Sequence, residues 1–487
     1  MTGQALSGQA LSGQALSGHA TSGQALSGRT EAGPQPVDLL PVTYLEEDWL
    51  GAVDLRASDH NLPLAIDIEG PFDHGLLLDA LRALTGRQET LRMAFTPTGA
   101  GIQRSVWPSM EPSMYTADLS DVPECERDQR LTSMILAEAR RPTDLTSPPL
   151  WRAFTARMAP GHHVLVTIWH HAIFDGWSTR VAFRDLTAAY ASLLRGKTPQ
   201  QAEPDVQMAD YAGWERQLTL PGDAVAYWRS ALPGGRASLP MDPAAEHAPQ
   251  VMAGRPYPTV SAAQLARLTE IARGVGATVT SALRAVVLTS LRPHLPDQAV
   301  IGCVHGNRDR PELQALIGLL SDHLPVRVDL SGGQSFLDLT AGVHDAVRTA
   351  RRYQAPAGLI AAAVPAIPPG EQMFEVSVNN MRQAAPLAGQ VTASDGATVR
   401  FAVRDLPGTQ LWPHISRPFS GGVRLGYQLR QTLAGELSGE IWGHVPAFEV
   451  ATVDALGQAF ARTVELVAGD PRQDVRSYPR PAGGRHP

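Results

Sequence analysis

Residues 162–178 read HHVLVTIWHHAIFDGWS, and this stretch decides how the rest of the chain is interpreted. Residues 164–169 are apolar apart from Thr167 and have the length of a strand that is buried on both faces. The pair His170-His171 follows at once, and Asp175-Gly176 completes a His-His-x-x-x-Asp-Gly pattern. Proteins of the α/β class often place catalytic groups where a strand ends and turns into a helix. The stretch therefore predicts a functional site at the end of a central strand.

The residue types in this pattern suit the transfer of an acyl group. An imidazole titrates near neutral pH and can accept the proton of an attacking amine or alcohol. We predict His171 as the catalytic histidine and His170 as a residue that supports the loop by hydrogen bonding. Asp175 either points back toward the imidazole or pairs with an arginine and locks the loop. Gly176 would let the backbone turn sharply into the next helix.

Composition and charge exclude several classes of function. Hydrophobic residues make up 43% of the 487 residues and charged residues 18%, as in a soluble globular protein. The net charge of −7 argues against a nucleic-acid partner, because such binding depends on clustered cations. No apolar run approaches the roughly 20 residues of a membrane-spanning helix, and no secretory signal is visible. Cys125 and Cys303 do not form a metal-ligand spacing, so we expect a cytoplasmic protein without a metal site.

The length predicts two lobes of roughly 150 to 200 residues each. Residues 1–35 carry a five-residue repeat that is too poor in apolar side chains to fold, and they are predicted to be a disordered tail. Residues 36–232 form the predicted N-terminal lobe, with mixed helix and strand patterns. Residues 233–250 are rich in Pro, Gly and Ala and are the predicted linker. Residues 251–470 form the predicted C-terminal lobe, and 471–487 a flexible tail, so the expected fold class is α/β (α+β).

Periodicity predicts several individual elements. Leu77, Leu81 and Leu84 recur at helical spacing, with Asp73 as the predicted N-cap. Another helix should follow the histidine pattern, with Ser178 as its N-cap. In the second half the predicted helices are 265–271 and 279–291, and the predicted strands are 300–304 and 326–330.

The pattern at 170–176 resembles the signature of the condensation-domain family of nonribosomal peptide synthesis. Further blocks similar to those of the family occur in the family's order between residues 37 and 470. They are Arg87–Phe95, Asp210–Trp214 with Tyr227-Trp228, Gly302–Arg308, and Ile317-Gly318 with Leu324–Arg327. Several ordered blocks are far more specific than a single motif.

This resemblance implies a fold of two chloramphenicol-acetyltransferase-like lobes arranged in a V, with the active site in a tunnel between them. It implies that His171 is catalytic and that Asp175 is a structural partner of an arginine. Arg308 matches the arginine of a second-lobe block and is the preferred partner, and Arg92 is a second candidate. No cofactor is expected to be bound. The substrate would arrive on the phosphopantetheine of an acyl or peptidyl carrier protein, with a small-molecule amine or alcohol as the acceptor.

Three stretches depart from the family's pattern, and they are residues 43–47, 319–322 and 353–356. The chain shows no carrier attachment site and no adenylation motif, so it resembles the freestanding condensation enzymes. The predicted function is transfer of a carrier-bound aminoacyl or acyl group to an amine or alcohol in natural-product biosynthesis. The sequence leaves open the donor, the acceptor, whether the bond is an amide or an ester, the oligomeric state and the role of the N-terminal repeat.

Two other functions are compatible with the histidine pattern. A wax-ester or diacylglycerol acyltransferase that uses acyl-CoA shares the pattern and an element like Pro149-Leu150-Trp151. A non-catalytic carrier-binding module is the other alternative. Such modules often lose the second histidine, whereas His171 is present here.

Overall fold

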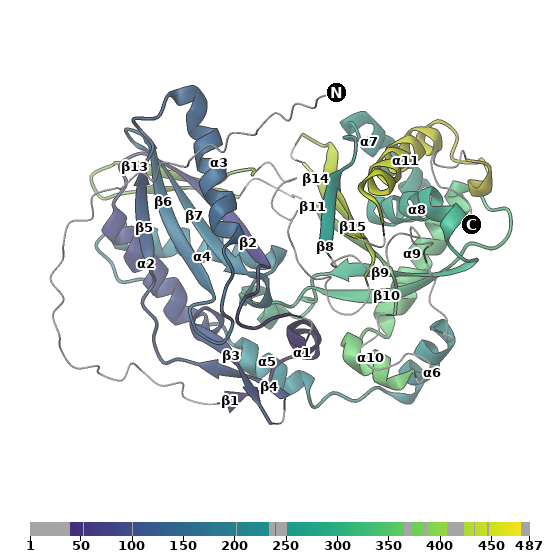
Figure 1. Ribbon diagram of the computed structural model, residues 1–487, viewed down its shortest axis with the longest axis horizontal. Helices are drawn as coiled ribbons and strands as arrows, with labels where there is room; N and C mark the ends of the chain where they lie inside the picture. The colour runs from purple at the N-terminus through teal and green to yellow at the C-terminus, as the bar shows by residue number, and fades with distance from the viewer. Residues whose placement is uncertain are drawn as a thin grey trace, which may run out of the picture. The chain divides into compact units, whose positions relative to one another are not determined.

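Two six-stranded sheets, each with its own helices, make up most of the computed structural model (Figure 1). The structure describes residues 39–51, 53–99, 101–200, 202–232, 239, 251–364, 373–382, 387–406, 423–432, 434–445 and 448–478. From Pro36 onward the chain forms one compact unit. The mixed α/β class predicted from the sequence is confirmed.

The strand that precedes the histidine pattern lies inside the first sheet, as predicted. This strand, β7, pairs antiparallel with β2 on one side and with β6 on the other. The strand order of the sheet is β12-β13-β2-β7-β6-β5. In that order the strands are Ala388–Thr392, Thr398–Val403, Asn61–Glu69, His162–His170, Trp151–Ala159 and Met114–Asp118.

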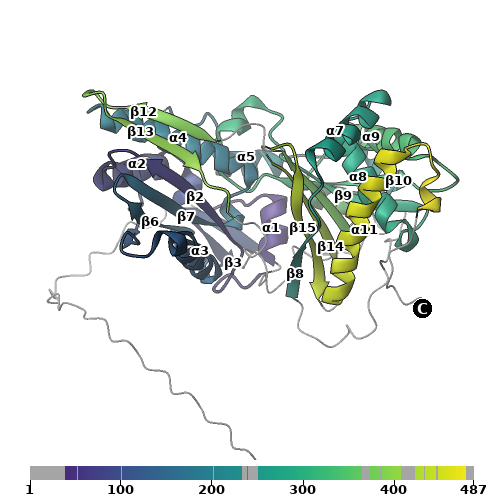
Figure 2. The ribbon, with the colours of Figure 1, turned by 90° about the horizontal axis from the view of Figure 1, so that it is seen from above.

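Helices cover both faces of this sheet, which explains why β7 is apolar along most of its length. Leu165 and Trp169 pack into the same core as α2 (His74–Arg87) and α4 (Gly176–Leu194). Val164 and Val166 point the other way and pack with α3 (Glu124–Arg140). Figure 2 shows α2 and α4 on one side of the strands and α3 on the other. A strand buried on both faces reads as a continuous apolar run, because neither side meets water.

The ends of two helices test the predicted caps. Asp73 caps α2 as predicted, and its Oδ1 accepts a hydrogen bond of 3.0 Å from the backbone N–H of Leu76. The cap of α4 is Asp175, so the prediction of Ser178 was wrong. A carboxylate is a stronger acceptor than a hydroxyl and also interacts favourably with the positive end of the helix. Ser178 instead donates its backbone N–H to Asp175 Oδ1 over 2.9 Å.

The second sheet has the strand order β10-β9-β11-β14-β15-β8. In that order the strands are Asp322–Asp329, Gln298–His305, Val376–Arg382, Leu425–Gln431, Leu437–Val445 and Val251–Pro256. The long helices that pack with it into one core are α7 (Ala262–Gly274), α8 (Val279–Leu291), α9 (Phe336–Arg352) and α11 (Val450–Gly469), and the shorter α6 (Gly222–Ala231) and α10 (Ala357–Ala363) also contribute to this core (Figure 1). The helices predicted at 265–271 and 279–291 and the strand predicted at 300–304 are therefore present, and the strand predicted at 326–330 is the second half of β10.

One hairpin of the second half belongs to the first sheet. Strands β12 and β13 follow β11 in the chain, yet β13 pairs antiparallel with β2, with Phe401 opposite Ile68. Val399 and Phe401 are buried in the core that contains α2 and α4. The hairpin thereby covers the edge of β2, which would otherwise expose unpaired backbone groups. The predicted C-terminal lobe of 251–470 does not hold for this segment, because local periodicity carries no information about long-range strand pairing.

The predicted linker and tails lie mostly outside the described residues. This applies to residues 1–35, to 479–487 and to 233–250 except Leu239, which is buried. Within the predicted C-terminal tail, residues 471–478 are packed instead of flexible. Val475 and Tyr478 are buried, and the Tyr478 hydroxyl donates to the carbonyl of Asp470 over 3.0 Å. Single anchoring side chains like these leave no periodic pattern in the sequence.

The remaining elements among the described residues are short. The helices are α1 (Tyr44–Gly51) and α5 (Met208–Glu215). The 3₁₀ turns are η1 (Glu89–Arg92), η2 (His171–Ile173), η4 (Arg292–His294), η5 (Pro311–Ala315) and η8 (Val475–Ser477). A three-stranded sheet has the order β1 (Leu39–Leu40), β4 (Gly101–Val106) and β3 (Met93–Thr98).

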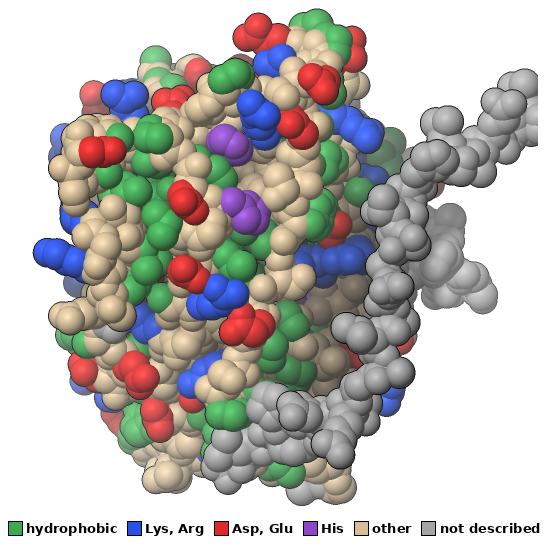
Figure 3. All heavy atoms as spheres, turned by 90° about the vertical axis from the view of Figure 1, so that its left-hand side faces the viewer, with side chains coloured by type: hydrophobic (Ala, Val, Ile, Leu, Met, Phe, Trp, Pro, Cys, Tyr) green, Lys and Arg blue, Asp and Glu red, His purple; other side chains and the backbone are tan. Residues whose placement is uncertain are grey.

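Charges are mixed over the face of the molecule seen in Figure 3, where acidic and basic side chains alternate with apolar ones. Among the described helices, none has by itself the length and apolar character needed to cross a membrane. One pair of helices meets these criteria only together, Ala262–Gly274 with Val279–His294, and it bends by 104° at the break.

A buried ion pair joins α1 to β4. Both carboxylate oxygens of Glu46 accept hydrogen bonds of 2.6 Å from Arg104 Nη2, and both side chains are at most 1% exposed. Glu46 also accepts from the N–H of Thr43 over 2.8 Å, and Thr43 Oγ1 accepts from the N–H of Glu46 over 3.0 Å. This reciprocal pair is a capping box at the start of α1. Glu46 lies in the stretch 43–47 that departs from the family's pattern, and its charge neutralises the buried Arg104.

We predict that Glu46→Gln lowers the free energy of unfolding by about 3–5 kcal/mol, because it leaves the guanidinium of Arg104 buried without a counter-charge. Urea unfolding followed by circular dichroism measures this change. Glu47→Gln is the matched control, since Glu47 pairs with Arg216 at 2.7 Å but is 52% exposed. This substitution should lower the free energy of unfolding by less than about 1 kcal/mol. Equal losses in the two variants would contradict the importance of the buried charge.

Candidate active site

The two histidines of the pattern differ in their exposure to solvent. His170 is the last residue of β7 and is fully buried. His171 begins η2, and its side chain is only partly buried. The backbone N–H of His171 donates to the carbonyl of His60 over 2.8 Å, which fixes the point where the chain leaves the sheet. Of the two imidazoles, the one predicted to be catalytic is therefore the accessible one.

His170 makes the contacts of a supporting residue. Its Nδ1 accepts a hydrogen bond of 3.2 Å from the backbone N–H of Ala172, so the ring proton sits on Nε2. Nε2 then donates to Ser58 Oγ, 2.9 Å away. The hydroxyl of Ser58 lies 3.4 Å from His60 Nδ1. Burial, followed by the neighbouring charges of His60 and His171, keeps the pKa of His170 well below its usual value. A neutral His170 in this chain of contacts can order the loop.

The imidazole of His171 is oriented by its own loop. Its Nδ1–H donates to the carbonyl of Phe174 over 2.8 Å, which places the basic lone pair on Nε2. Burial lowers the pKa of His171 from its usual value, and the backbone hydrogen bonds and the charge of Asp175 oppose this shift only in part. The ring of Trp49 packs beside both imidazoles, with its centroid 6.3 Å from that of His171. His171 is therefore held as a neutral base at neutral pH.

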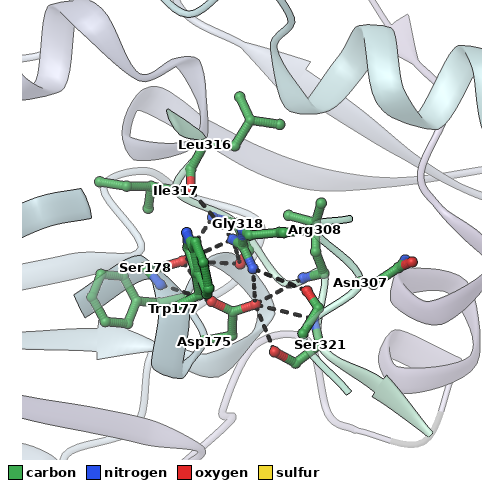
Figure 4. A network of polar contacts seen from close by, with 12 residues as sticks. Asp175, Trp177, Ser178, Asn307, Arg308, Leu316, Ile317, Gly318 and Ser321 are labelled. Carbon is green, nitrogen blue, oxygen red and sulfur yellow. Dashed lines mark hydrogen bonds and ion pairs between the residues drawn. The ribbon is translucent and has the colours of Figure 1, made fainter. Parts of the chain in front are cut away.

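The carboxylate of Asp175 holds the loop in place by binding six donors. Figure 4 shows how these donors converge on it. Oδ1 accepts from the backbone N–H and the hydroxyl of Ser178, at 2.9 and 2.8 Å. Oδ2 accepts from Arg308 Nη1 at 2.7 Å, from the N–H of Leu320 at 3.2 Å, and from the N–H and hydroxyl of Ser321, both at 3.0 Å. Burial alone would raise the pKa of Asp175, but Arg308 and Ser178 hold it below its usual value.

The predicted pairing of Asp175 with Arg308 is present in the structure, and both side chains are 1% exposed. The second amino group of Arg308, Nη2, lies 3.3 Å from the carbonyl of Leu316 and 3.4 Å from that of Gly318 (Figure 4). This one guanidinium thus joins the start of α4 to the segment between β9 and β10. Asp175 does not point back to the imidazole, the other possibility that the sequence left open.

Two predicted site residues have other roles than expected. Arg92 is not a partner of Asp175, because its guanidinium donates to the carbonyl of Trp107 and holds η1 against the end of β4. Gly176 does not adopt a left-handed conformation, and a Cβ there would meet nothing within 4 Å. The predicted need for a sharp glycine turn is therefore wrong, and nothing in the structure explains why glycine stands at this position.

The sequence analysis missed a second network of hydrogen-bonded side chains near the site. Glu215 accepts from the N–H of Tyr44 at 2.7 Å and from the hydroxyl of Tyr211 at 3.2 Å. Tyr211 in turn accepts from Asn307 Nδ2 at 2.9 Å, and Asn307 accepts from Gln354 at 3.0 Å. Burial raises the pKa of Glu215 to about 7. A sequence signal was present, because Glu215 directly follows the block 210–214 and Gln354 lies in the stretch 353–356 that was compared with the family's pattern.

Two further partly buried histidines, His323 and His305, lie in the second half of the chain, and the charge of His171 acts on His323. His323 on β10 lies 2.8 Å from Ser377 Oγ through its Nε2. Burial, followed by the charges of His305 and His171, lowers the pKa of His323 to about 4. Burial likewise lowers the pKa of His305 to about 4. In the described part of the chain, no three His, Cys, Asp or Glu side chains are grouped so that they could hold a metal ion.

Comparison with known proteins identifies relatives of this chain. The family model of the Condensation domain matches residues 50–383. One of the proteins that make up the linear gramicidin synthase of Brevibacillus parabrevis is 29% identical over 436 residues, which cover 86% of this chain and 5% of that protein. Phosphinothricin tripeptide synthetase PhsC of Streptomyces viridochromogenes is 28% identical over 445 residues, which cover 86% of this chain and 38% of that protein. The chain thus spans well under half of these relatives.

Solved structures share the fold. The SgcC5 protein from Streptomyces globisporus superposes with a TM-score of 0.76 at 21% identity, covering 89% of this chain and all of that one. The X-domain from teicoplanin biosynthesis superposes with a TM-score of 0.72 at 23% identity, covering 94% of this chain and all of that domain.

We predict that Asp175→Asn lowers the free energy of unfolding by about 3–5 kcal/mol and lowers activity with it. The amide leaves the buried charge of Arg308 without a counter-charge. Denaturant titration of the wild type and the variant measures the decrease in the free energy of unfolding. Ser321→Ala, which removes a single hydroxyl bond to the same oxygen, is the control and should cost about 1 kcal/mol. If Asp175→Asn lost activity at unchanged stability, Asp175 would act in the chemistry and not as a brace.

We predict that Glu215 makes stability depend on pH. Its pKa is about 7 in the folded chain against an ordinary value of 4.5, so the folded state binds the proton more tightly. Its contribution to stability is complete below pH 4.5 and is lost as the pH rises through 7. Between pH 5 and pH 8 the free energy of unfolding of the wild type should therefore fall by about 2.5 kcal/mol more than that of Glu215→Gln.

The measurement is the free energy of unfolding at both pH values. Glu111→Gln serves as the control, because Glu111 is 78% exposed and should leave the pH dependence of the wild type unchanged. If the free energy of unfolding depended on pH in the same way in the wild type and in Glu215→Gln, Glu215 would be ionised in the folded chain and the prediction would be wrong.

Proposed function

The chain belongs to the condensation-domain family, and we propose that it transfers a thioester-bound aminoacyl or acyl group from a carrier protein to an amine or alcohol. The observation that carries this proposal is the geometry of His171. Its imidazole is partly accessible, is neutral at neutral pH, and has its Nδ1 proton bound by the carbonyl of Phe174. Nε2 is thereby the atom that can receive or position a proton of the acceptor.

In the proposed reaction, the acceptor nitrogen or oxygen attacks the thioester carbonyl carbon while its proton moves to His171 Nε2. A C–N or C–O bond forms, the C–S bond breaks, and the proton leaves with the thiol. A positioned general base contributes roughly 10²- to 10⁴-fold to the rate, and holding both substrates in place supplies much of the rest. Asp175 and Arg308 support this step by fixing the loop, and no bound cofactor takes part in the proposal.

The relatives support two classes of acceptor. Phosphinothricin tripeptide synthetase is named for a peptide product, which favours an amine acceptor and an amide bond. The SgcC5 structure holds a diol, (R)-(-)-1-(2-naphthyl)-1,2-ethanediol, which supports an alcohol acceptor as a second substrate class. We propose both acceptors for the same histidine.

A second candidate function is acyl transfer from coenzyme A. The starter condensation domain of rhizomide synthetase, which has this fold, was solved with C8-CoA. A third, a recruitment module without catalysis, is supported by the complex of the teicoplanin X-domain with OxyB. Product formation from carrier-loaded aminoacyl donors, from octanoyl-CoA, or from neither separates the three.

We predict that His171→Ala lowers kcat/KM by about 10²- to 10⁴-fold on the true substrate pair, with unchanged folding. Because the pKa of His171 lies below 6.5, kcat/KM of the wild type should be flat above pH 7 and fall at lower pH. That acid limb should disappear in His171→Ala. Mass spectrometry of the condensed product measures both effects.

The matched control is His162→Ala at the other end of the same strand, where His162 lies 2.8 Å from Asp67. It should change kcat/KM by less than about 2-fold, since it lies outside the site. Near-complete turnover by His171→Ala would rule out the proposed base.

A further inference from the structure

A cavity of about 690 Å³ lies next to the Asp175–Arg308 pair, on the side of the second sheet. Arg308 and Trp177 form part of its wall, and the opposite walls come from the end of β9, the start of α8 and the last turns of α9. His305 also lines it. Arg308 in this wall donates a hydrogen bond to Asp175, four residues along the chain from the proposed catalytic base His171.

The wall of this cavity contains a buried cation without a counter-charge. Arg284 on α8 is 8% exposed and lines the cavity. Within the part of the chain that the structure describes, its buried Nε has no hydrogen-bond partner and its guanidinium makes no ion pair. A desolvated charge of this kind costs several kcal/mol unless a ligand or a partner neutralises it.

The other arginines of the wall are neutralised by the protein. Arg308 pairs with Asp175 at 2.7 Å, Arg351 with Asp309 at 2.8 Å, and Arg348 with Asp345 at 3.0 Å. Asp309 is an acidic residue in the wall of the cavity, and its carboxylate forms the ion pair with Arg351. The cavity therefore keeps one net positive charge, which belongs to Arg284.

The start of α8 adds hydrogen-bond donors on the same face. Thr280 and Ser281 line the cavity, four and three residues before Arg284, so the three side chains lie on one side of the helix. Thr280 Oγ1 accepts from Asn380 Nδ2 at 2.8 Å, which leaves its hydroxyl proton to be donated elsewhere. Ser281 Oγ lies 3.1 Å from His344 Nδ1. The positive end of this 13-residue helix favours an anion at the same place.

We propose that Arg284, Thr280 and Ser281 bind a free carboxylate carried by one of the two molecules that the enzyme condenses. The substrate class is then a dicarboxylic acyl group or an amino acid with a second carboxylate. This inference rests on the proposed function, because it assigns a specificity to that reaction. A guanidinium offers two parallel donors that match a carboxylate. The phosphate of a carrier arm is attached to the surface of its carrier and stays at the mouth, whereas Arg284 is nine-tenths buried.

The test measures binding, so it does not depend on turnover. The probes are two pantetheine conjugates in which an amide replaces the thioester, one ending in a succinyl carboxylate and the other in the matching carboxamide. By isothermal titration the wild type should bind the carboxylate about 10- to 100-fold more tightly than the carboxamide. Arg284→Gln should reduce this preference to less than about 3-fold.

Two variants serve as controls. Arg348→Gln removes a cation from the same wall, but Arg348 is 76% exposed and already paired, so it should keep the preference. His171→Ala should also keep it, which separates this inference from the proposed catalysis. Circular dichroism and urea unfolding establish that each variant is folded.

Three outcomes would overturn the inference. The first is equal affinity of the wild type for the two probes, which decides the matter even if Arg284→Gln does not fold. The second is a preference that survives in folded Arg284→Gln. The third is an Arg284-dependent gain for phosphopantetheine over pantetheine with none for the carboxylate, which would assign Arg284 to the carrier arm. Failure of all condensation reactions with a retained carboxylate preference would overturn the proposed function alone.

Discussion

The ion pair between Asp175 and Arg308 is the contact on which the site depends. Two charges that are each 1% exposed lose their hydration, and a separation of 2.7 Å compensates this loss only when the remaining donors and acceptors are also satisfied. Here Asp175 accepts six hydrogen bonds, three of them from Leu320 and Ser321 in the second half of the chain. The start of α4 and the segment between β9 and β10 are held together by one carboxylate, so neither can move without exposing a charge.

This arrangement also sets the basicity of His171. A carboxylate bonded directly to the imidazole would raise its pKa and favour the charged form. Asp175 is instead engaged by Arg308 and Ser178, and the Nδ1 proton of His171 goes to the uncharged carbonyl of Phe174. Burial can therefore keep the pKa of His171 below its usual value, so that the imidazole is neutral and can accept a proton at neutral pH. Asp175, which stabilises the loop, must stay ionised beside Arg308, whereas His171, the proposed base, must stay neutral. Two separate residues can meet these two requirements.

Sequence reasoning succeeded where the signal is local. The apolar run of β7 and the Asp73 cap follow from spacing and side-chain chemistry alone. Arg308 lies 133 residues from Asp175 and was found only through the resemblance to a family, since no periodicity links them. The pairing of β13 with β2 was missed for the same reason. The hydrogen-bond network from Glu215 to Gln354 was missed although both residues adjoin or belong to stretches that were compared with the family. The choice of Ser178 as a cap failed because two acceptors compete for one helix end, and spacing does not rank them.

Arg284 and Arg308 show why burial alone does not assign a role. Both guanidinium groups are more than nine-tenths buried and both line the same cavity. Arg308 has a carboxylate, so its charge is used within the fold and stabilises the loop. Arg284 lies in an apolar helix where the sequence predicts only core, and among the described residues it has no carboxylate. A buried charge without a counter-ion destabilises the fold. Arg308 has its counter-ion within the protein, whereas under the proposal the substrate brings the counter-ion of Arg284.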